Sequence, residues 1–212
     1  MKLPIWIALL SLFPLFFSSS GEWQFKKEDA GIKVYWRESD EHRIREIRIT
    51  FEVEAGLNAV MAVLKDVDAF PEWIYKCSET RLLSRDSGTL YYSVMDFPWP
   101  LTDRDAISYA RFEQDPHTKV IRSLNTALPN ALERHPDRIR LETMRIQWVI
   151  TPLTTHRSSI EYQLQTDPGG SLPAWLVNMA IDSGPTKSMK AFRKLTQRAS
   201  YRSAQVPGVE NL

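Results

Sequence analysis

The sequence predicts an α+β fold with a curved antiparallel β-sheet and one long C-terminal α-helix. Segments with the two-residue period of strands follow one another through the middle of the chain, and residues 172–198 change to the 3.6-residue period of a helix. The chain has 212 residues, 43% of them apolar and 25% charged, and it shows no internal repeat. Such a composition fits one domain with one sizeable core.

The N-terminus has the pattern of a secretory signal peptide. An apolar run over residues 3–17 follows the single basic residue Lys2, and four small residues come next. We therefore expect residues 1–20 to be a signal peptide cleaved near Ser20, which places the mature protein in the periplasm or outside the cell. The run is shorter than the roughly 20 apolar residues that span a bilayer, and an uncleaved anchor is the alternative.

The charges of the mature chain balance. The signal segment contains one of the 27 basic residues and none of the 26 acidic residues, so 26 of each sign remain. This balance gives no electrostatic attraction for nucleic acid, and we expect no such partner. Cys77 is the only cysteine, so no intrachain disulfide can form and stability must come from packing.

The first elements are read from periodicity and turn residues. Apolar residues occupy every second position from Ile47 to Val53 and alternate with polar residues, as in a strand with one wet face. A helix with one apolar stripe follows and is expected to cover the apolar face of that strand. The predicted elements are a short helix over residues 22–29, a strand over 32–37, a strand over 45–54 and a helix over 57–64.

Six further strands are predicted, with short turn-rich links that imply antiparallel pairing. In the fifth of them the apolar pattern changes parity between Leu141 and Met144, as an inserted bulge residue would cause. We therefore expect the sheet to bend sharply there. The six strands span residues 77–84, 89–95, 105–112, 119–125, 139–150 and 158–165.

The last predicted element is the longest helix in the chain, residues 172–198. Pro185, preceded by Gly184, lies inside it and has no N–H to bond the carbonyl of Ile181, so a kink or a division is expected there. The domain is expected to span residues 21–200. The remaining residues, 201–212, are predicted to be a flexible tail.

Catalytic and metal-binding patterns are missing from the sequence. The four histidines have no metal-ligand spacing, no serine occupies a Gly-x-Ser-x-Gly turn, and no glycine-rich loop suits a phosphate. We expect no catalytic residue, no metal and no cofactor. Arg104 lies between Asp103 and Asp105, and it is either a binding group for an anionic head or, as we favour, a paired structural arginine.

Three stretches resemble the START (StAR-related lipid transfer) domain family, in exported bacterial form. They are FPWPLTDRD at residues 97–105, WVITP at 148–152 and DPGGSLPAWLVN at 167–178. Their order and spacing also fit, and the similarity spans roughly residues 22–200. The resemblance implies the helix-grip fold of START and Bet v 1-like proteins, in which the curved sheet and the long helix enclose a tunnel for one hydrophobic ligand.

The resemblance and the inward parity of the strands together suggest which side chains line that tunnel. For each aromatic candidate, ordinary core packing is the competing interpretation. Several family members carry a charged wall residue where this chain has Ala110, and Arg111 has the opposite parity, so the ligand is left open between sterol and phospholipid. The candidate wall residues are Trp73, Tyr91, Trp99, Arg104, Trp148, Met179 and Ile181.

The resemblance implies that the chain binds a lipid or another hydrophobic molecule and transfers it between membranes or carriers. Loop aromatics such as Trp99 are then expected to touch a membrane transiently, with a gate formed by Trp175, Gly184 and Pro185 in the last helix. A sensor or sequestering module is the first alternative. A cyclase or aromatase on the same fold and a purely structural module are weaker alternatives. We expect a monomer that catalyses no reaction.

Overall fold

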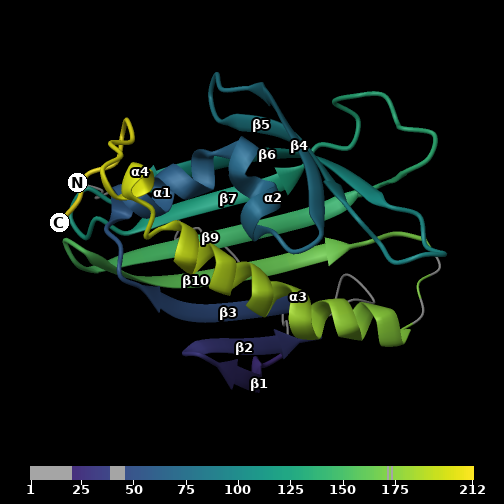
Figure 1. Ribbon diagram of the computed structural model, residues 1–212, viewed down its shortest axis with the longest axis horizontal. Helices are drawn as coiled ribbons and strands as arrows, with labels where there is room; N and C mark the ends of the chain where they lie inside the picture. Colours follow the sequence, from purple (N-terminus) through teal and green to yellow (C-terminus); the bar gives the residue numbers. More distant parts are fainter. Residues whose placement is uncertain (1–20, 39–45, 171, 173) are drawn as a thin grey trace, which may run out of the picture.

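The computed structural model describes residues 21–38, 46–170, 172 and 174–212, and within the last range it describes side chains from residue 184 onward. These residues form a sheet of ten strands with helices on one face (Figure 1). The sheet order is β1-β2-β3-β10-β9-β7-β6-β5-β4, with β8 beside β6. The strands are β1 Gln24–Asp29, β2 Ile32–Arg37, β3 Glu46–Val53, β4 Cys77–Ser84, β5 Thr89–Met95, β6 Arg104–Gln114, β7 Ile121–Ala127, β8 Ile139–Arg140, β9 Thr143–Thr154 and β10 Arg157–Asp167.

The helices lie across the concave face of the sheet. The longest, α3, crosses this face in Figure 1, and its C-terminal half lies beside α2. The helices are α1 Leu57–Lys65, a 3-10 helix Val67–Ala69, α2 Phe70–Trp73, α3 Ala174–Leu195 and α4 Ala199–Arg202. This arrangement confirms the predicted α+β fold, a large antiparallel sheet that packs against a long C-terminal helix. The sheet does not close on itself, because β1 and β4 remain its two edges.

The alternating patterns correctly identified the faces of the strands. Along β3, Ile47, Ile49, Phe51 and Val53 are all buried in the main core, as predicted. The same parity holds in the neighbouring strand β10, where Ile160 pairs with Phe51 and is fully buried. The period-two rule therefore distinguishes the concave face, which carries the core, from the convex face.

Two predicted elements were wrong. Residues 24–29 form strand β1 instead of a helix, because they pair with β2 in a hairpin whose turn at Ala30 and Gly31 has positive φ angles. Residues 139–150 do not form one bulged strand. The parity change near Leu141 marks a break between β8, which pairs in parallel with β6, and β9, which pairs with β7 and β10.

Helix α3 is assigned as one continuous helix through Pro185, so the chain does not divide there. Its C-terminal half is fixed to α2 by a side chain one turn beyond the proline. The Ser188 hydroxyl accepts a hydrogen bond from the Tyr75 backbone N–H at 2.9 Å and donates one to the Gly184 carbonyl at 3.1 Å. This half of the helix is anchored, and Pro185 lies at the boundary of the anchored part.

The C-terminal residues differ from the predicted flexible tail. They pack against α1 through the side chain of Asn58. This side chain accepts a hydrogen bond from the Val206 N–H at 2.7 Å and donates one to the Val209 carbonyl at 3.5 Å. The end of β6 holds the same segment, because the Gln114 side chain bonds the backbone of Glu210 in both directions. The tail is thus part of the folded domain.

A second, smaller apolar cluster lies on the convex face. It contains Tyr92, Val94 and Ile107, which alternate with concave-face residues on β5 and β6. Beside it, Arg140 donates to both carboxylate oxygens of Asp105 at 2.8 and 2.9 Å, and both side chains are 1% exposed. The segment between β7 and β8 covers this ion pair, since Arg140 also bonds three of its carbonyls.

The predicted signal segment, residues 1–20, lies outside the described residues. Within the part of the chain that the structure describes, no helix is long and apolar enough to cross a membrane. The described residues also contain no group of histidine, cysteine or carboxylate side chains suited to a metal ion.

Candidate ligand-binding site

One half of the concave face is filled by aromatic side chains. Phe192 of α3 is 0% exposed, and its ring centroid lies 5.1 Å from that of Trp73, 5.4 Å from that of Trp148 and 6.3 Å from that of Phe51. The Trp148 ring also contacts the Tyr162 ring at 4.8 Å. Two predicted wall residues, Trp73 and Trp148, therefore lie in a closely packed cluster. We call this region the packed half.

The other half of the concave face lies where β7 and β10 end and α3 begins. Inward-facing residues here are only partly buried: Met95, Asn125, Ile146 and Leu164 all retain accessible surface. Their neighbours in the packed half, such as Ile150, are completely buried. The described side chains thus cover this end of the concave face only in part. We call it the open half, and it is our candidate site for a ligand.

On β5, β6 and β7 the wall of the open half also carries small side chains, some of them neutral and polar. In β5 and β6 the inward positions hold Ser93, Ala106 and Ser108, and the facing position of β7 holds Ala127. Small side chains leave room in front of a sheet that bulky side chains would fill. In the described residues of β3, β5, β6, β7, β9 and β10, Arg104 is the only charged side chain at an inward position of the sheet.

A group of neutral hydrogen-bonding side chains lies in the open half, at its border with the packed half. Asn125 donates to the Tyr91 hydroxyl at 3.2 Å, and burial raises the pKa of Tyr91, so the phenol stays protonated. Ser108 pairs directly with Tyr91 across the strands and is 0% exposed. Its hydroxyl lies near that of Tyr91 but makes no well-formed hydrogen bond to a protein atom. An unpartnered buried hydroxyl is costly, and a ligand that bonds it removes that cost.

Arg104 is at the edge of the open half and connects two loops. Its guanidinium donates to the Pro168 and Gly169 carbonyls at 3.1 Å each and also to the Thr102 carbonyl. Its face lies 4.1 Å from the Phe97 ring, and the residue is 2% exposed. These contacts make Arg104 a structural arginine that joins the β5–β6 loop to the loop before α3. They leave it poorly placed to bind a ligand head.

The prediction that Trp99 lines the interior was wrong, because this residue is 92% exposed. It lies in the β5–β6 loop, where the alternation of a strand does not orient side chains. The side chains of Trp175, Met179 and Ile181 lie outside the described residues, so their predicted roles are not tested. Gly184 is buried, and a Cβ atom added to it would lie 3.1 Å from the Tyr75 ring.

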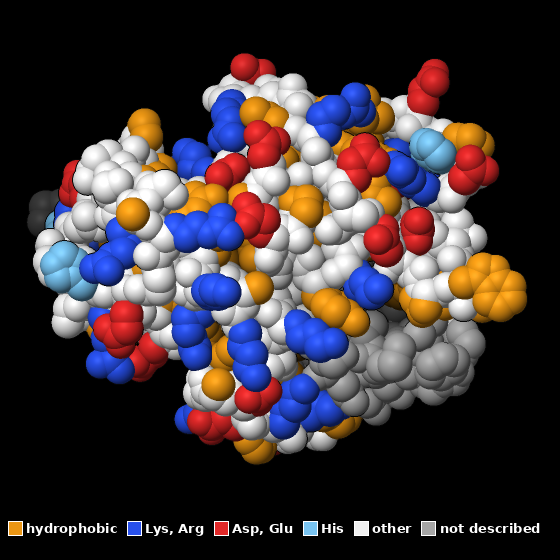
Figure 2. Space-filling view, in the orientation of Figure 1, with side chains coloured by type: hydrophobic (Ala, Val, Ile, Leu, Met, Phe, Trp, Pro, Cys, Tyr) orange, Lys and Arg blue, Asp and Glu red, His pale blue; other side chains and the backbone are white. Residues whose placement is uncertain are grey.

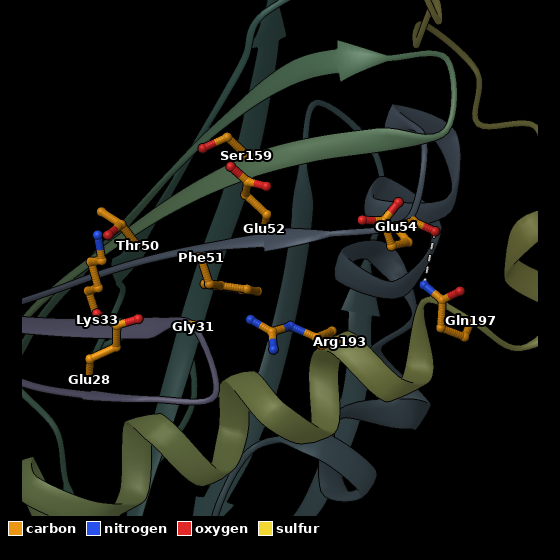
Figure 3. A pocket seen from close by; sticks show the side chains of 10 residues that line it. All are labelled: Glu28, Gly31, Lys33, Thr50, Phe51, Glu52, Glu54, Ser159, Arg193 and Gln197. Atoms are coloured by element: carbon orange, nitrogen blue, oxygen red, sulfur yellow. Dashed lines mark hydrogen bonds between the residues drawn. The ribbon is translucent and has the colours of Figure 1, made fainter.

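A separate cleft of about 630 Å³ opens between β3 and the last turns of α3 (Figure 3). Figure 3 shows the Arg193 guanidinium reaching toward Phe51 from the helix, and its Nη1 donates to the Ala30 carbonyl at 2.8 Å. Charges of both signs line the cleft, so it is an open polar surface that does not suit an apolar chain. The lining residues are Glu28, Gly31, Lys33, Thr50, Phe51, Glu52, Glu54, Ser159, Arg193 and Gln197.

Ala110 and Arg111 face the sides of the sheet that their parity predicts. Ala110 packs against the main core, whereas Arg111 is exposed on the convex face, as its parity predicts. Arg111 lines a shallow groove of about 140 Å³ there together with other basic and polar residues. This groove is on the opposite side of the sheet from the open half.

Ser108 and Asn125 are not among the wall residues predicted from the sequence, because those were chosen mainly for their aromatic side chains. The signal was nevertheless present in the strand parity. Ser108 shares a face with Ala106 and Ala110, and Asn125 shares one with Ile121. Small or neutral polar residues at inward positions of neighbouring strands mark the part of a sheet that bulky side chains do not fill.

Comparisons with known proteins give a consistent result. Uncharacterized protein PA1579 of Pseudomonas aeruginosa is 29% identical over 178 residues, which cover 84% of this chain and 88% of that protein. The phosphatidylcholine transfer protein of Rattus norvegicus is 24% identical over 84% of this chain and 86% of its own length. The curated relatives whose names state an activity are transfer proteins, in agreement with the prediction that the chain is not an enzyme.

Solved structures share the same fold. The STAR-related lipid transfer protein of Xanthomonas axonopodis superposes with a TM-score of 0.76 at 29% identity, over 83% of this chain and 99% of that one. Human STARD10 superposes with a TM-score of 0.73 at 22% identity, over 84% of this chain and 74% of that one. The START domain model matches residues 14–202, which is most of the sequence. The chain therefore belongs to the START domain family.

Proposed function

We propose that the protein encloses one lipid-like molecule against the open half of the concave face and carries it between membranes. The observation that carries the proposal is the partly uncovered wall of inward-facing Met95, Asn125, Ile146 and Leu164 on a START fold. The names of the relatives from Rattus norvegicus and Xanthomonas axonopodis, which state lipid transfer, support the same activity. The apolar leader at residues 3–17 supports a further proposal, that the protein acts as a monomer after export to the periplasm or beyond.

The physical reason for enclosure is the cost of exposing acyl chains to water. Burial of one methylene gains roughly 0.8 kcal/mol, so a 16-carbon chain gains on the order of 13 kcal/mol on leaving water. A carrier must therefore close around its cargo and open at a membrane. The start of α3 is the best element to open, because it lies beside the open half while the part beyond Pro185 is anchored to α2.

Native mass spectrometry of the chain purified from its own host, followed by organic extraction, tests the proposal. A stoichiometric lipid of defined mass is the expected result. Repeated absence of a bound lipid, even after the protein is incubated with vesicles, would contradict enclosure and favour a structural module. Uptake without release to acceptor vesicles would instead indicate a sensor or a sequestering protein.

Exposed Trp99 is the proposed membrane contact, because an indole ring is suited to the membrane–water interface. Basic side chains gathered over the C-terminal half of α3 add attraction for anionic lipid (Figure 2). Trp99→Ala is expected to slow transfer between vesicles about tenfold, on the scale of one lost interfacial aromatic. Phe25→Ala is the matched control, because Phe25 is an exposed aromatic on the edge strand β1. Equal effects of the two substitutions would contradict a specific contact.

Pro185 is the proposed hinge of the gate, because it leaves the carbonyl of Ile181 without its usual helical partner. Pro185→Ala restores that donor and is expected to slow transfer several-fold while lipid occupancy stays the same. Vesicle-to-vesicle transfer and the thermal midpoint are measured together. An unchanged transfer rate at unchanged stability would count against a hinge at this position.

A further inference from the structure

We propose that the ligand of the open half is a lipid whose polar end is an uncharged oxygen, a hydroxyl or a carbonyl, and not a phosphate head group. This inference rests on the proposed function and specifies its cargo. Three side chains carry it. The Ser108 hydroxyl, the Tyr91 hydroxyl and the Asn125 amide lie on neighbouring strands and face the same side of the sheet.

The hydrogen-bonding capacity of this group is only partly used. Asn125 donates one N–H to the Tyr91 hydroxyl, which leaves the phenolic proton of Tyr91 available as a donor. The Ser108 hydroxyl lies near the Tyr91 hydroxyl but makes no well-formed hydrogen bond to a protein atom, and Ser108 is completely buried. A hydroxyl or carbonyl oxygen of a ligand would accept a proton from these hydroxyls, and a ligand hydroxyl would also donate to Ser108. The group is thus complementary to one neutral oxygen.

The charge of the same wall opposes a buried phosphate. A phosphate removed from water requires an arginine or lysine partner to offset its desolvation. In β3, β5, β6, β7, β9 and β10, as far as they are described, the sole inward cation is Arg104, and its guanidinium is committed to the carbonyls of Thr102, Pro168 and Gly169. Withdrawing it would release two loops at the edge of the site. A neutral head therefore fits this wall, and a phosphate does not.

The test uses two lipids that differ only in the head group. The full chain is incubated with vesicles containing equal amounts of dioleoylglycerol and dioleoylphosphatidylcholine, and bound lipid is identified by native mass spectrometry. We expect dioleoylglycerol to be favoured at least about tenfold, which is the discrimination of a buried polar group against a mismatched ligand. A second set of vesicles containing cholesterol distinguishes a sterol from a diacylglycerol as the source of the neutral oxygen.

Two substitutions locate the recognition. Ser108→Ala and Tyr91→Phe each remove one hydroxyl and are expected to lower the preference for dioleoylglycerol about 3- to 10-fold, the range of one neutral hydrogen bond. Ser159→Ala is the matched control. Ser159 alternates with inward-facing Ile160 on β10 and lines the polar cleft of Figure 3, away from the proposed recognition group. Ser108→Ala is expected to fold normally, since it deletes a hydroxyl that makes no well-formed hydrogen bond to a protein atom.

The outcomes separate this inference from the proposed function. Uptake of phosphatidylcholine as well as or better than diacylglycerol overturns the inference and leaves lipid carriage intact. An unchanged preference in both Ser108→Ala and Tyr91→Phe also overturns it, because recognition would then occur elsewhere. Uptake of neither lipid nor cholesterol removes the proposed function and this inference with it.

Discussion

The packed half and the open half of the concave face belong to the same sheet but are stabilised from opposite sides. In the packed half, Phe192, Trp73 and Trp148 fill the space in front of the strands. In the open half the front carries small residues such as Ala106 and Ser108, while support comes from behind. There the convex cluster around Ile107 and the Asp105–Arg140 ion pair lie on the other face of the same strands.

This difference shows how a sheet can leave room for a guest without losing its shape. Side chains that pack in front of the sheet would compete with a ligand for the same space. Bracing on the convex face does not, because the backbone lies between the brace and the ligand. We infer that Asp105, Arg140 and the segment they anchor keep the wall in place whether or not a ligand is present.

The largest expected effect comes from breaking the buried Asp105–Arg140 ion pair. Arg140→Met leaves the buried Asp105 carboxylate without its partner and is expected to lower the free energy of unfolding by about 3–5 kcal/mol. The matched control is Arg157→Met, which removes an exposed pair with Glu52 and should cost about 0–1 kcal/mol. Urea unfolding curves measure both. Similar losses for the two variants would contradict a bracing role for the buried pair.

The contribution of the Asp105–Arg140 ion pair to the free energy of unfolding should also depend on pH. Burial alone would raise the pKa of Asp105, but hydrogen bonds and charge from Arg140 outweigh burial and hold it below the usual value of 3.8. The stabilisation is therefore complete above the unfolded-state pKa and is lost as the pH falls through the lower folded-state pKa. The difference in stability between the wild-type chain and Arg140→Met should shrink as the pH falls from about 5 through the usual Asp value of 3.8 and below it. A difference that stays constant over this range would contradict the charge-based explanation.

A matched pair of conservative substitutions compares the fronts of the two halves directly. Ile150 is completely buried in the packed half, and Ile146 occupies the corresponding inward position of β9 in the open half. Ile150→Val is expected to cost about 1 kcal/mol, the usual result of deleting a buried methyl, and Ile146→Val about half of that or less. Equal losses in chemical denaturation would show that the open half is packed as tightly as its neighbour.

A labelling rate compares the two halves at their boundary without any change in stability. Cys77 pairs with Met95, and burial raises the pKa of its thiol to about 12. At pH 8 its thiolate fraction is then on the order of 10⁻⁴, so iodoacetamide should react at least about a hundredfold more slowly with the folded chain than with the chain in urea. Comparable rates would indicate that the open half loosens as far as β4.

Most of the sheet could be predicted from sequence because its strands have one buried and one wet face. The alternation from Ile47 to Val53 and from Ile160 to Leu164 reports that asymmetry directly. Strand β1 could not be recognised, because its side chains are largely exposed and hydrogen bonds to β2 decide its conformation. Strand β8 has two residues and a parallel partner that is distant in sequence, which local periodicity does not reveal.

The candidate site was less predictable than the fold. Periodicity placed Tyr91 and Trp148 on the inward face but gave no information on whether the space before them is filled. Trp99 could not be placed, since loops lack a period. The interpretation of Arg104 as a structural arginine agrees with its three carbonyl partners, and two of these partners lie more than sixty residues away in the sequence. Such contacts depend on tertiary structure.

The docking of the last residues onto α1 has a consequence for the order in which the protein can mature. Asn58 bonds residues that follow it by 148 and 151 positions, so these contacts cannot form until Val206 and Val209 have been synthesised. A nascent chain lacks these contacts with Asn58, and until shortly before they form it also lacks the anchored half of α3. The concave face therefore stays uncovered until α3 and residues 199–209 have been synthesised. Cargo is expected to load only after these residues have docked.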